Sequence, residues 1–543
     1  MARALSEAER SSAIHSLIGT EPGDGRLIPK PIAAPDFFKI QPNPSHPAVA
    51  RASDFRIGRV ESGFDGHPPD VLLYVNPAGL AGDGPSTQAL QVAEGMRKIA
   101  NILNIPFYYA GASGGVSDIS EEKFTGSLPE QITSFSESNG DTPAKYKTVE
   151  KTLTDTIYDL ANKGHENIFI VSTGYTGFVP FGLKRAIETV KQETRKNIRA
   201  KLIMQDSSFP DEDNPSFDTT VDGYPYDRFY PPGYASNADV EVWMLNNSWI
   251  DFNIKWARHR APNGIVGASS SIPFTPEYIH RWTEWREVKK ESAREMLAEY
   301  VRSSDPAFAE ELVKKDNIFI PFFASSGYFD ASNIGKWLTR AQFDDMMIGS
   351  KKLVHAAREI ARLTGKKVLL SGVPKFIEIA NSLNLPDMAE ITASEAKKAK
   401  VLLVRAPRFP QSKYGMYHRA ADVVIHRTVQ ANSSAESVIA GVPQLIFTIP
   451  GEGYMDAPKM DQGAYLRGLR QYTSEVDMLK LASRLTDIAT DPGEAASLVD
   501  AADTYFLQNH KNPGTNFFTM VAHLAGIPIP PFPNADTVYV TNQ

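Results

Sequence analysis

The chain contains no cysteine among its 543 residues. It therefore has no disulfide, no thiol nucleophile and no cysteine-ligated zinc or iron–sulfur centre. This absence agrees with a reducing compartment, and we expect a cytoplasmic protein. The sequence also lacks the run of roughly 18 apolar residues that a membrane-spanning helix requires. Residues 1–19 lack the continuous apolar core of a signal peptide.

A strong excess of either charge is lacking as well. The formal net charge is −7, from 57 Lys and Arg against 64 Asp and Glu, and no basic block offsets it. A nucleic-acid partner is therefore not expected. The sequence has no repeat at a fixed period. What remains is an ordinary globular composition, 42% apolar and 22% charged, at a length that predicts two or three domains.

The first 69 residues have the composition of an extension. We expect a short helix at 5–18. Prolines follow at positions 22, 29, 31, 35, 42, 44 and 47. Because proline disfavours regular structure in its own residue and in the one before it, we expect a Pro-rich segment that lies on a domain surface.

An alternation of apolar runs and amphipathic stretches begins at residue 70. The run DVLLYVNP (70–77) is nearly continuous, as in a strand that is buried on both faces of a parallel sheet. A glycine-rich loop (78–85) separates it from a helical pattern at 86–104. The same succession predicts strands at 105–112, 167–174, 200–206 and 239–248, and helices at 147–163, 181–196 and 276–302.

A second alternation begins with the apolar run at 316–329 and ends with the stretch at 421–450. It predicts strands at 366–373 and 400–404 and helices at 349–364 and 374–383. Two such blocks predict an α/β protein with two Rossmann-like doubly wound domains that face a cleft. The expected ranges are 1–69 for the extension, 70–305 and 306–505 for the two domains, and 506–543 for a tail whose helix packs back on the first domain.

The stretch at 421–450 reads as strand, loop, helix and strand. Asn432 is a favourable residue for the start of the helix, where backbone N–H groups lack intrahelical partners. Ser433 and Ser434 add hydroxyl donors. This end of the helix is therefore a candidate anion site.

Three segments together resemble the glycosyltransferases with the GT-B fold. The family has an N-S-T-L-E core, a G-V-P turn and an apolar strand that ends in proline. Residues 432–450, NSSAESVIAGVPQLIFTIP, are similar to that pattern. The loop with Gly79, Gly82 and Asp83 resembles the family's G-x-x-G-D element, and Ser325-Ser326-Gly327 resembles the turn that opens its second domain.

The resemblance implies a role for each matching residue. Asn432, Ser433 and Ser434 would bind the donor diphosphate, and Glu436 would accept hydrogen bonds from ribose hydroxyls. Gly82 and the turn Ser325-Ser326-Gly327 would line the same donor site. Asp83 would be the catalytic base. The alternatives are an ordinary helix start, a glutamate that complements the helix dipole, and an aspartate that only shapes a turn.

Two parts of the family pattern are missing. The family's H-G-G precedes the N-S-T core, whereas this chain has Thr428-Val429-Gln430, so His426 or Arg427 is expected to reach the phosphates. Arg405 and Lys413 are further candidate cations. The family's acidic residue and glutamine should follow the proline strand. Here Glu452 or Asp456 would take that role.

The resemblance implies transfer of a sugar from a nucleotide-diphosphate donor, most simply a UDP-sugar, to an acceptor. We expect the transfer to invert the configuration at the sugar carbon and to use no metal or other cofactor. The acceptor could be a small molecule, glycan, lipid or polypeptide. The alternatives are a nucleotide-sugar epimerase on the same fold and a degenerate binding or scaffold protein. An acidic cluster (Asp206, Asp211, Glu212 and Asp213) could instead hold a metal, but we favour a solvated loop there.

Overall fold

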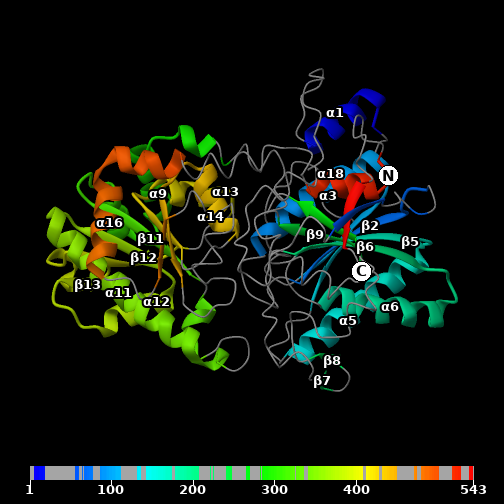
Figure 1. Cartoon of the computed structure of the whole chain (residues 1–543), viewed down its shortest axis with the longest axis horizontal. Coiled ribbons are helices and arrows are strands. Elements are labelled where there is room, and N and C mark those ends of the chain that lie inside the picture. The colour runs from blue at the N-terminus through cyan, green and yellow to red at the C-terminus, as the bar shows by residue number, and fades with distance from the viewer. Residues whose placement is uncertain are drawn as a thin grey trace. The chain divides into compact units, whose positions relative to one another are not determined.

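The computed structural model describes a large part of the chain. The described residues are 5–18, 55–59, 64, 67–77, 86–111, 131–135, 142–173, 178–206, 220–221, 224–225, 240–246, 265–269, 282, 284–324, 326–334, 340–407, 411–426, 431–448, 470–473, 478–500, 517–527 and 537–541. They form two compact units (Figure 1). Unit 1 comprises Met1–Tyr278 and Asn509–Gln543, and unit 2 comprises Ile279–Gln508.

Unit 1 contains a nine-stranded sheet, in the order β1-β18-β10-β9-β6-β5-β2-β3-β4. The strands from β10 to β4 are parallel, and β18 and β1 add an antiparallel edge. The strands are β1 (Phe55–Arg59), β2 (Val71–Asn76), β3 (Phe107–Gly111), β4 (Gln131–Ser134), β5 (Asn167–Thr173), β6 (Arg199–Asp206), β9 (Val240–Asn246), β10 (Ile265–Ser269) and β18 (Thr537–Thr541). A separate short hairpin pairs β7 (Thr220–Val221) with β8 (Tyr224–Pro225).

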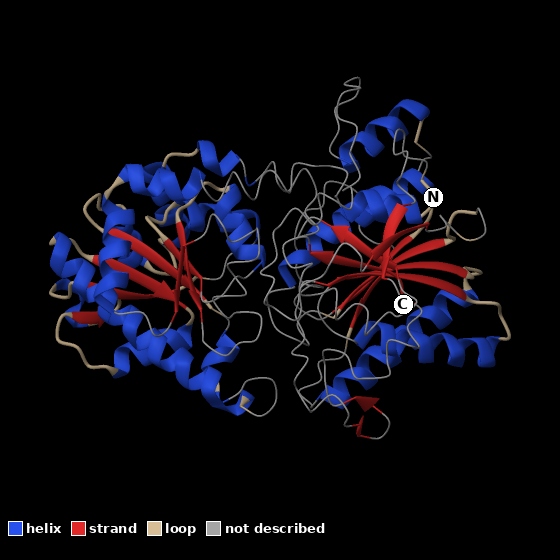
Figure 2. Ribbon diagram, viewed as in Figure 1, coloured by secondary structure: helices blue, strands red, loops and turns tan. Residues whose placement is uncertain are grey.

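Helices cover both faces of this sheet (Figure 2). They are α1 (Glu7–Ile18), α3 (Ser86–Leu103), α5 (Thr142–Asn162), α6 (Phe178–Thr194) and α18 (Phe517–Leu524). Alternate residues of β2 serve the two faces: Val71, Leu73 and Val75 join the core under α5 and α6, whereas Leu72 and Tyr74 join the core under α3 and α18. The two-sided burial explains why this strand is an unbroken apolar run.

The C-terminal helix α18 packs on unit 1 through an aromatic side chain. A Cβ atom built on Gly95 of α3 would lie 2.1 Å from the Phe518 ring, so only glycine leaves room for that ring. The following strand β18 pairs with β1 of the N-terminal segment. The segment 1–69 therefore contributes a strand to the sheet, which its proline-rich composition did not predict.

Unit 2 contains a seven-stranded parallel sheet, in the order β13-β14-β12-β11-β15-β16-β17. The strands are β11 (Ile318–Phe323), β12 (Val368–Gly372), β13 (Met388–Glu390), β14 (Val401–Arg405), β15 (Val424–His426), β16 (Gln444–Thr448) and β17 (Arg470–Thr473). The helices are α9 (Lys290–Val301), α10 (Pro306–Leu312), α11 (Arg340–Thr364), α12 (Pro374–Ser382), α13 (Gln411–Arg419), α14 (Ala431–Ile439) and α16 (Met478–Thr490), with short 3₁₀ helices η5 (Ser326–Phe329), η6 (Ala331–Asn333) and η7 (Ser394–Lys397).

The division between the units falls between Tyr278 and Ile279, earlier than the expected boundary at 305/306. Helix α9 belongs to unit 2 because its buried Arg294 forms an ion pair with Asp422 and donates a hydrogen bond to the Ala420 carbonyl at 3.0 Å. The sequence showed a charged helix but not the distant carboxylate that it would meet.

The predicted fold class is confirmed: each unit is a doubly wound, mainly parallel α/β sheet of the Rossmann type. The cleft between the units stays a prediction. Among the described residues, no helix combines the length and apolar character needed to cross a membrane.

Candidate functional site

The order of strands reverses in the middle of the parallel unit 2 sheet. Strands β12, β13 and β14 lie on one side of β11, and β15, β16 and β17 lie on the other. Ligands of such sheets bind where the strand order reverses, beyond the carboxyl ends of the strands. Phe323 of β11 is in register with His426 of β15, so both strands end at the same level. The candidate site lies above this pair.

Helix α14 begins beside these strand ends. It starts at Ala431, so Asn432 lies in the first turn and is not the N-cap that the sequence predicted. The helix thus begins two residues earlier than an N-cap at Asn432 would place it. The first four N–H groups of a helix have no intrahelical partner. The backbone of residues 431–434 is therefore the part of α14 that could bind an anion. The structure describes only the backbone of Asn432 and Ser434, not their side chains.

Glu436 lies one turn further along α14, with 4% of its surface exposed. Burial raises the pKa of Tyr414 on α13, and the nearby negative charge of Glu436 raises it further. The carboxylate therefore lies on the side of α14 that α13 covers. A buried carboxylate in this place offers two acceptor oxygens to vicinal hydroxyls of a ligand that reaches it.

A buried hydrogen-bond network supports the first turns of α14. Ser437 Oγ donates to the Ser433 carbonyl at 2.9 Å. The same oxygen lies 2.8 Å from His418 Nδ1 and 3.1 Å from His426 Nε2. Because the hydroxyl proton is already used, both ring nitrogens must donate to Ser437. Phe323 stacks on both rings, at centroid distances of 4.7 Å to His418 and 5.3 Å to His426.

His426 therefore has a different role from the expected one. Its ring is fully buried, and burial lowers its pKa to about 3, so it is neutral at pH 7. Burial also lowers the pKa of His418 well below its ordinary value, and the neighbouring His426 lowers it further. A neutral, covered imidazole cannot supply positive charge to a phosphate. The structure makes His426 a support for α14.

The other predicted residues of unit 2 divide into two groups. Ser326 is exposed and Gly327 half-buried at the start of η5, directly after β11, so they lie at the candidate site. Arg405 lies at the end of β14, where Nε donates to Glu390 Oε1 at 2.7 Å. Since β12 separates β14 from β11, the structure brings Arg405 to Glu390 and not to α14. Lys413 is exposed on α13.

Several predicted residues lie outside the described part of the chain. These are Gly82, Asp83, Ser325, Arg427, Glu452 and Asp456, together with Asp211, Glu212 and Asp213 of the acidic cluster. Asp206 ends β6, where only the backbone is described. Within the described residues, no group of three or more His, Asp or Glu side chains could hold a metal ion.

Unit 1 has its own reversal point, between β2 and β5. The Tyr74 hydroxyl lies 2.7 Å from Thr173 Oγ1, and burial raises the pKa of Tyr74. Asn76, at the end of β2, is also buried. The loop that carries Asp83 begins just after this strand. These polar residues were not predicted from the sequence, although Asn76 and Thr173 each end an apolar run, which is a signal that the sequence contains.

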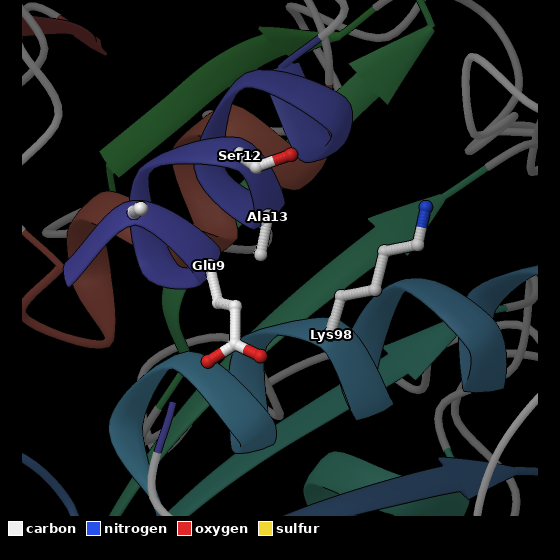
Figure 3. A pocket seen from close by; sticks show the side chains of 5 residues that line it. Glu9, Ser12, Ala13 and Lys98 are labelled. Carbon is white, nitrogen blue, oxygen red and sulfur yellow. The ribbon is translucent and has the colours of Figure 1, made fainter. Parts of the chain in front are cut away.

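A surface hollow of about 560 Å³ lies between α1 and α3 in unit 1 (Figure 3). Glu9 and Lys98 line it with small residues of α1. The Glu9 carboxylate accepts the Ser6 N–H at 2.8 Å, and the Ser6 hydroxyl accepts the Glu9 N–H at 3.3 Å, which is a capping box. Glu9 thus stabilises the start of α1, and the hollow is not a candidate active site.

The sequence matches no protein-family model and no curated protein. Solved structures similar to the chain have low sequence identity. A trehalose-phosphate synthase (UDP-forming) from Burkholderia vietnamiensis is 10% identical, with TM-score 0.49 over 85% of this chain and 98% of that one. A putative UDP-N-acetylglucosamine 2-epimerase from Listeria monocytogenes is 12% identical, with TM-score 0.43 over 81% and 93%. An Arabidopsis thaliana protein complexed with UDP-L-rhamnose is 12% identical, with TM-score 0.46 over 85% and 100%.

Proposed function

We propose that unit 2 binds a nucleoside-diphosphate sugar at the reversal point between β11 and β15, and that the protein transfers the sugar to an acceptor. One observation carries this proposal. The first turn of α14 begins beside the carboxyl ends of β11 and β15, which lie in register, and Glu436 lies one turn further along the helix. This arrangement suits a diphosphate at the N-terminal N–H groups of α14 and a ribose near the carboxylate.

The nucleoside diphosphate is the leaving group of the proposed reaction. Its negative charge grows as the glycosidic bond breaks, so groups that stabilise that charge accelerate the reaction. The helix dipole alone supplies about 0.3–1 kcal/mol, or up to about 2 kcal/mol when partly buried. A positive side chain is therefore needed. Because His426 is neutral and Arg405 is bonded to Glu390, Arg427 is the strongest of the candidate cations.

The chemical step needs a base for the acceptor nucleophile. Asp83 follows β2, the strand at the reversal point of unit 1, and we assign it this role. A positioned base contributes about 10²–10⁴-fold to such a rate. The proposed reaction inverts the configuration at the sugar carbon and uses no metal. A UDP-sugar is the donor we would test first.

Donor binding tests the first half of the proposal. Isothermal titration calorimetry would measure UDP binding to the wild type, to Glu436→Gln and to the control Glu378→Gln. Glu378 lies on α12 of the same unit and pairs with Lys375 on the surface at 2.9 Å. Loss of a hydrogen bond to a charged group costs about 1.5–3 kcal/mol, so we expect Glu436→Gln to bind UDP about 10–100 times more weakly. Equal affinity in both variants would contradict the ribose assignment.

Donor turnover tests the second half. Mass spectrometry would follow a panel of UDP-sugars with and without a mixture of candidate acceptors. Transfer predicts UDP release that depends on the acceptor. Isomerisation of the donor without an acceptor would identify an epimerase instead, and the absence of any nucleotide binding would indicate a scaffold protein.

A further inference from the structure

A second cavity lies at the opposite, amino end of the unit 2 sheet. It has a volume of about 390 Å³. Ala421 and Asp422, which precede β15, line one side together with Gly441 and Pro443, which precede β16. The end of α16 and the helical residues 492–500 form the other side. The cavity is thus separated from the first turn of α14 by the length of that helix.

Three basic side chains lie among the mainly small and apolar residues that line this cavity. Arg286, Lys290 and Arg419 contribute three positive charges, against the carboxylates of Asp422 and Asp500. Asp422 already accepts a 2.6 Å bond from Lys290 and is paired with the buried Arg294. Its negative charge is therefore compensated within the protein.

The two arginines are held against the last turn of α14. Arg419 Nε donates to the Val288 carbonyl at 2.7 Å and Nη1 donates to the Gly441 carbonyl at 3.0 Å. Arg286 Nη2 lies 3.5 Å from the Val438 carbonyl. The negative end of a helix dipole corresponds to only about half an elementary charge. That negative end favours the presence of both guanidinium groups at the last turn of α14.

The two arginines are also close enough for their positive charges to repel each other. Burial lowers the pKa of Arg419, and the positive charge of Arg286 lowers it further, while Glu291 and Glu287 act in the opposite direction. An anion between the two guanidinium groups would relieve their mutual repulsion. The planar fork of arginine matches the oxygens of phosphate particularly well.

The backbone is shaped to admit Arg286. Gly441 has φ = +65°, and a Cβ atom at this position would lie 2.8 Å from Arg286 Nε. Glycine thus allows both the left-handed turn and the close approach of the guanidinium group. Arg286 comes from the segment before α9, so the tertiary fold brings its side chain to the end of α14.

We propose that this cavity binds a small phosphate-bearing metabolite, with Arg286 and Arg419 as its phosphate ligands. The volume lies within the range of small-molecule sites, about 300–1,000 Å³. The proposal concerns a site distinct from the donor site and does not depend on the proposed function.

Inorganic phosphate is the probe for a first test. Calorimetry at constant ionic strength would compare the wild type with Arg286→Gln and with the control Arg302→Gln. The exposed side chain of Arg302 lies at the C-cap of α9 and pairs with Glu299. We expect binding to the wild type and to the control, and at least tenfold weaker binding to Arg286→Gln. No phosphate binding to the wild type, or undiminished binding to Arg286→Gln, would overturn the proposal.

A second variant tests the opposite direction. Asp500 is exposed at the rim, and Asp500→Asn removes a negative charge without removing a ligand. We expect it to bind phosphate about two- to fivefold more tightly, because an exposed charge acts weakly through solvent. Saturation with UDP should leave phosphate binding intact. Phosphate that UDP displaces from both the wild type and Arg286→Gln belongs to the donor site and would contradict the assignment.

Discussion

The buried pair His418 and His426 makes the stability of unit 2 depend on pH. Both imidazoles are neutral in the folded protein, where burial lowers the pKa of His426 to about 3 and that of His418 well below its ordinary value. In the unfolded chain they titrate near pH 6.5. Below that pH the unfolded state binds more protons, so stability falls as the pH falls. The contribution is complete above pH 6.5 and is lost progressively towards pH 3.

The magnitude follows from proton linkage. Each histidine that stays neutral when folded removes about 1.4 kcal/mol of stability per pH unit below 6.5. Between pH 7.5 and 5.5 each therefore removes about 1.4 kcal/mol, and the pair removes about 2.7 kcal/mol. The perturbation is His426→Gln, which deletes one of the two titrating groups and leaves His418 bonded to Ser437.

Urea-induced unfolding at half-unit steps from pH 7.5 to 4.5 would measure this dependence. Other groups contribute equally to both curves, so the difference between wild type and His426→Gln isolates one histidine. We expect that difference to change by about 1.4 kcal/mol per pH unit below pH 6. Parallel curves would show that His426 is not held neutral, and would refute the buried network.

Two further perturbations test the packing of the units. Arg294→Met leaves the Asp422 carboxylate buried without its buried arginine partner and should cost about 3–5 kcal/mol in urea-induced unfolding. Arg302→Met, at the exposed C-cap of the same helix, should cost less than about 1 kcal/mol. Gly95→Ala places a Cβ 2.1 Å from the Phe518 ring and should release α18, which limited proteolysis would detect as faster C-terminal cleavage; a cleavage rate equal to that of the wild type would contradict the described contact.

The sequence predicted those strands in which nearly every residue is buried. The apolar runs of β2 and β11 are strands because both faces of their sheets are covered, and such runs are visible locally. The pairing of β18 with β1 was not predicted, because nothing in the sequence of two short, distant strands indicates that they pair with each other. Helix α9 was placed in the wrong unit, since the partner of Arg294 lies 128 residues away.

The candidate site shows the same limit. The motif at 432–436 predicted a helix that begins beside a strand end, and the structure has a helix there that starts at Ala431. His426 was expected to bind phosphate because residue type and spacing were all that the sequence offered. Its burial under Phe323 and its bond to Ser437 depend on tertiary packing, and both remove it from that role.

The most direct test of the proposed donor site is hydrogen–deuterium exchange with and without saturating UDP. We predict slower exchange in peptides that contain residues 431–436 and the start of η5, because the ligand would cover the first turn of α14, whose N–H groups have no partner within the helix. Peptides from the edge strand β13 and from its neighbour β14 should exchange at the same rate in both states. UDP that binds but protects only segments away from α14 would contradict the account.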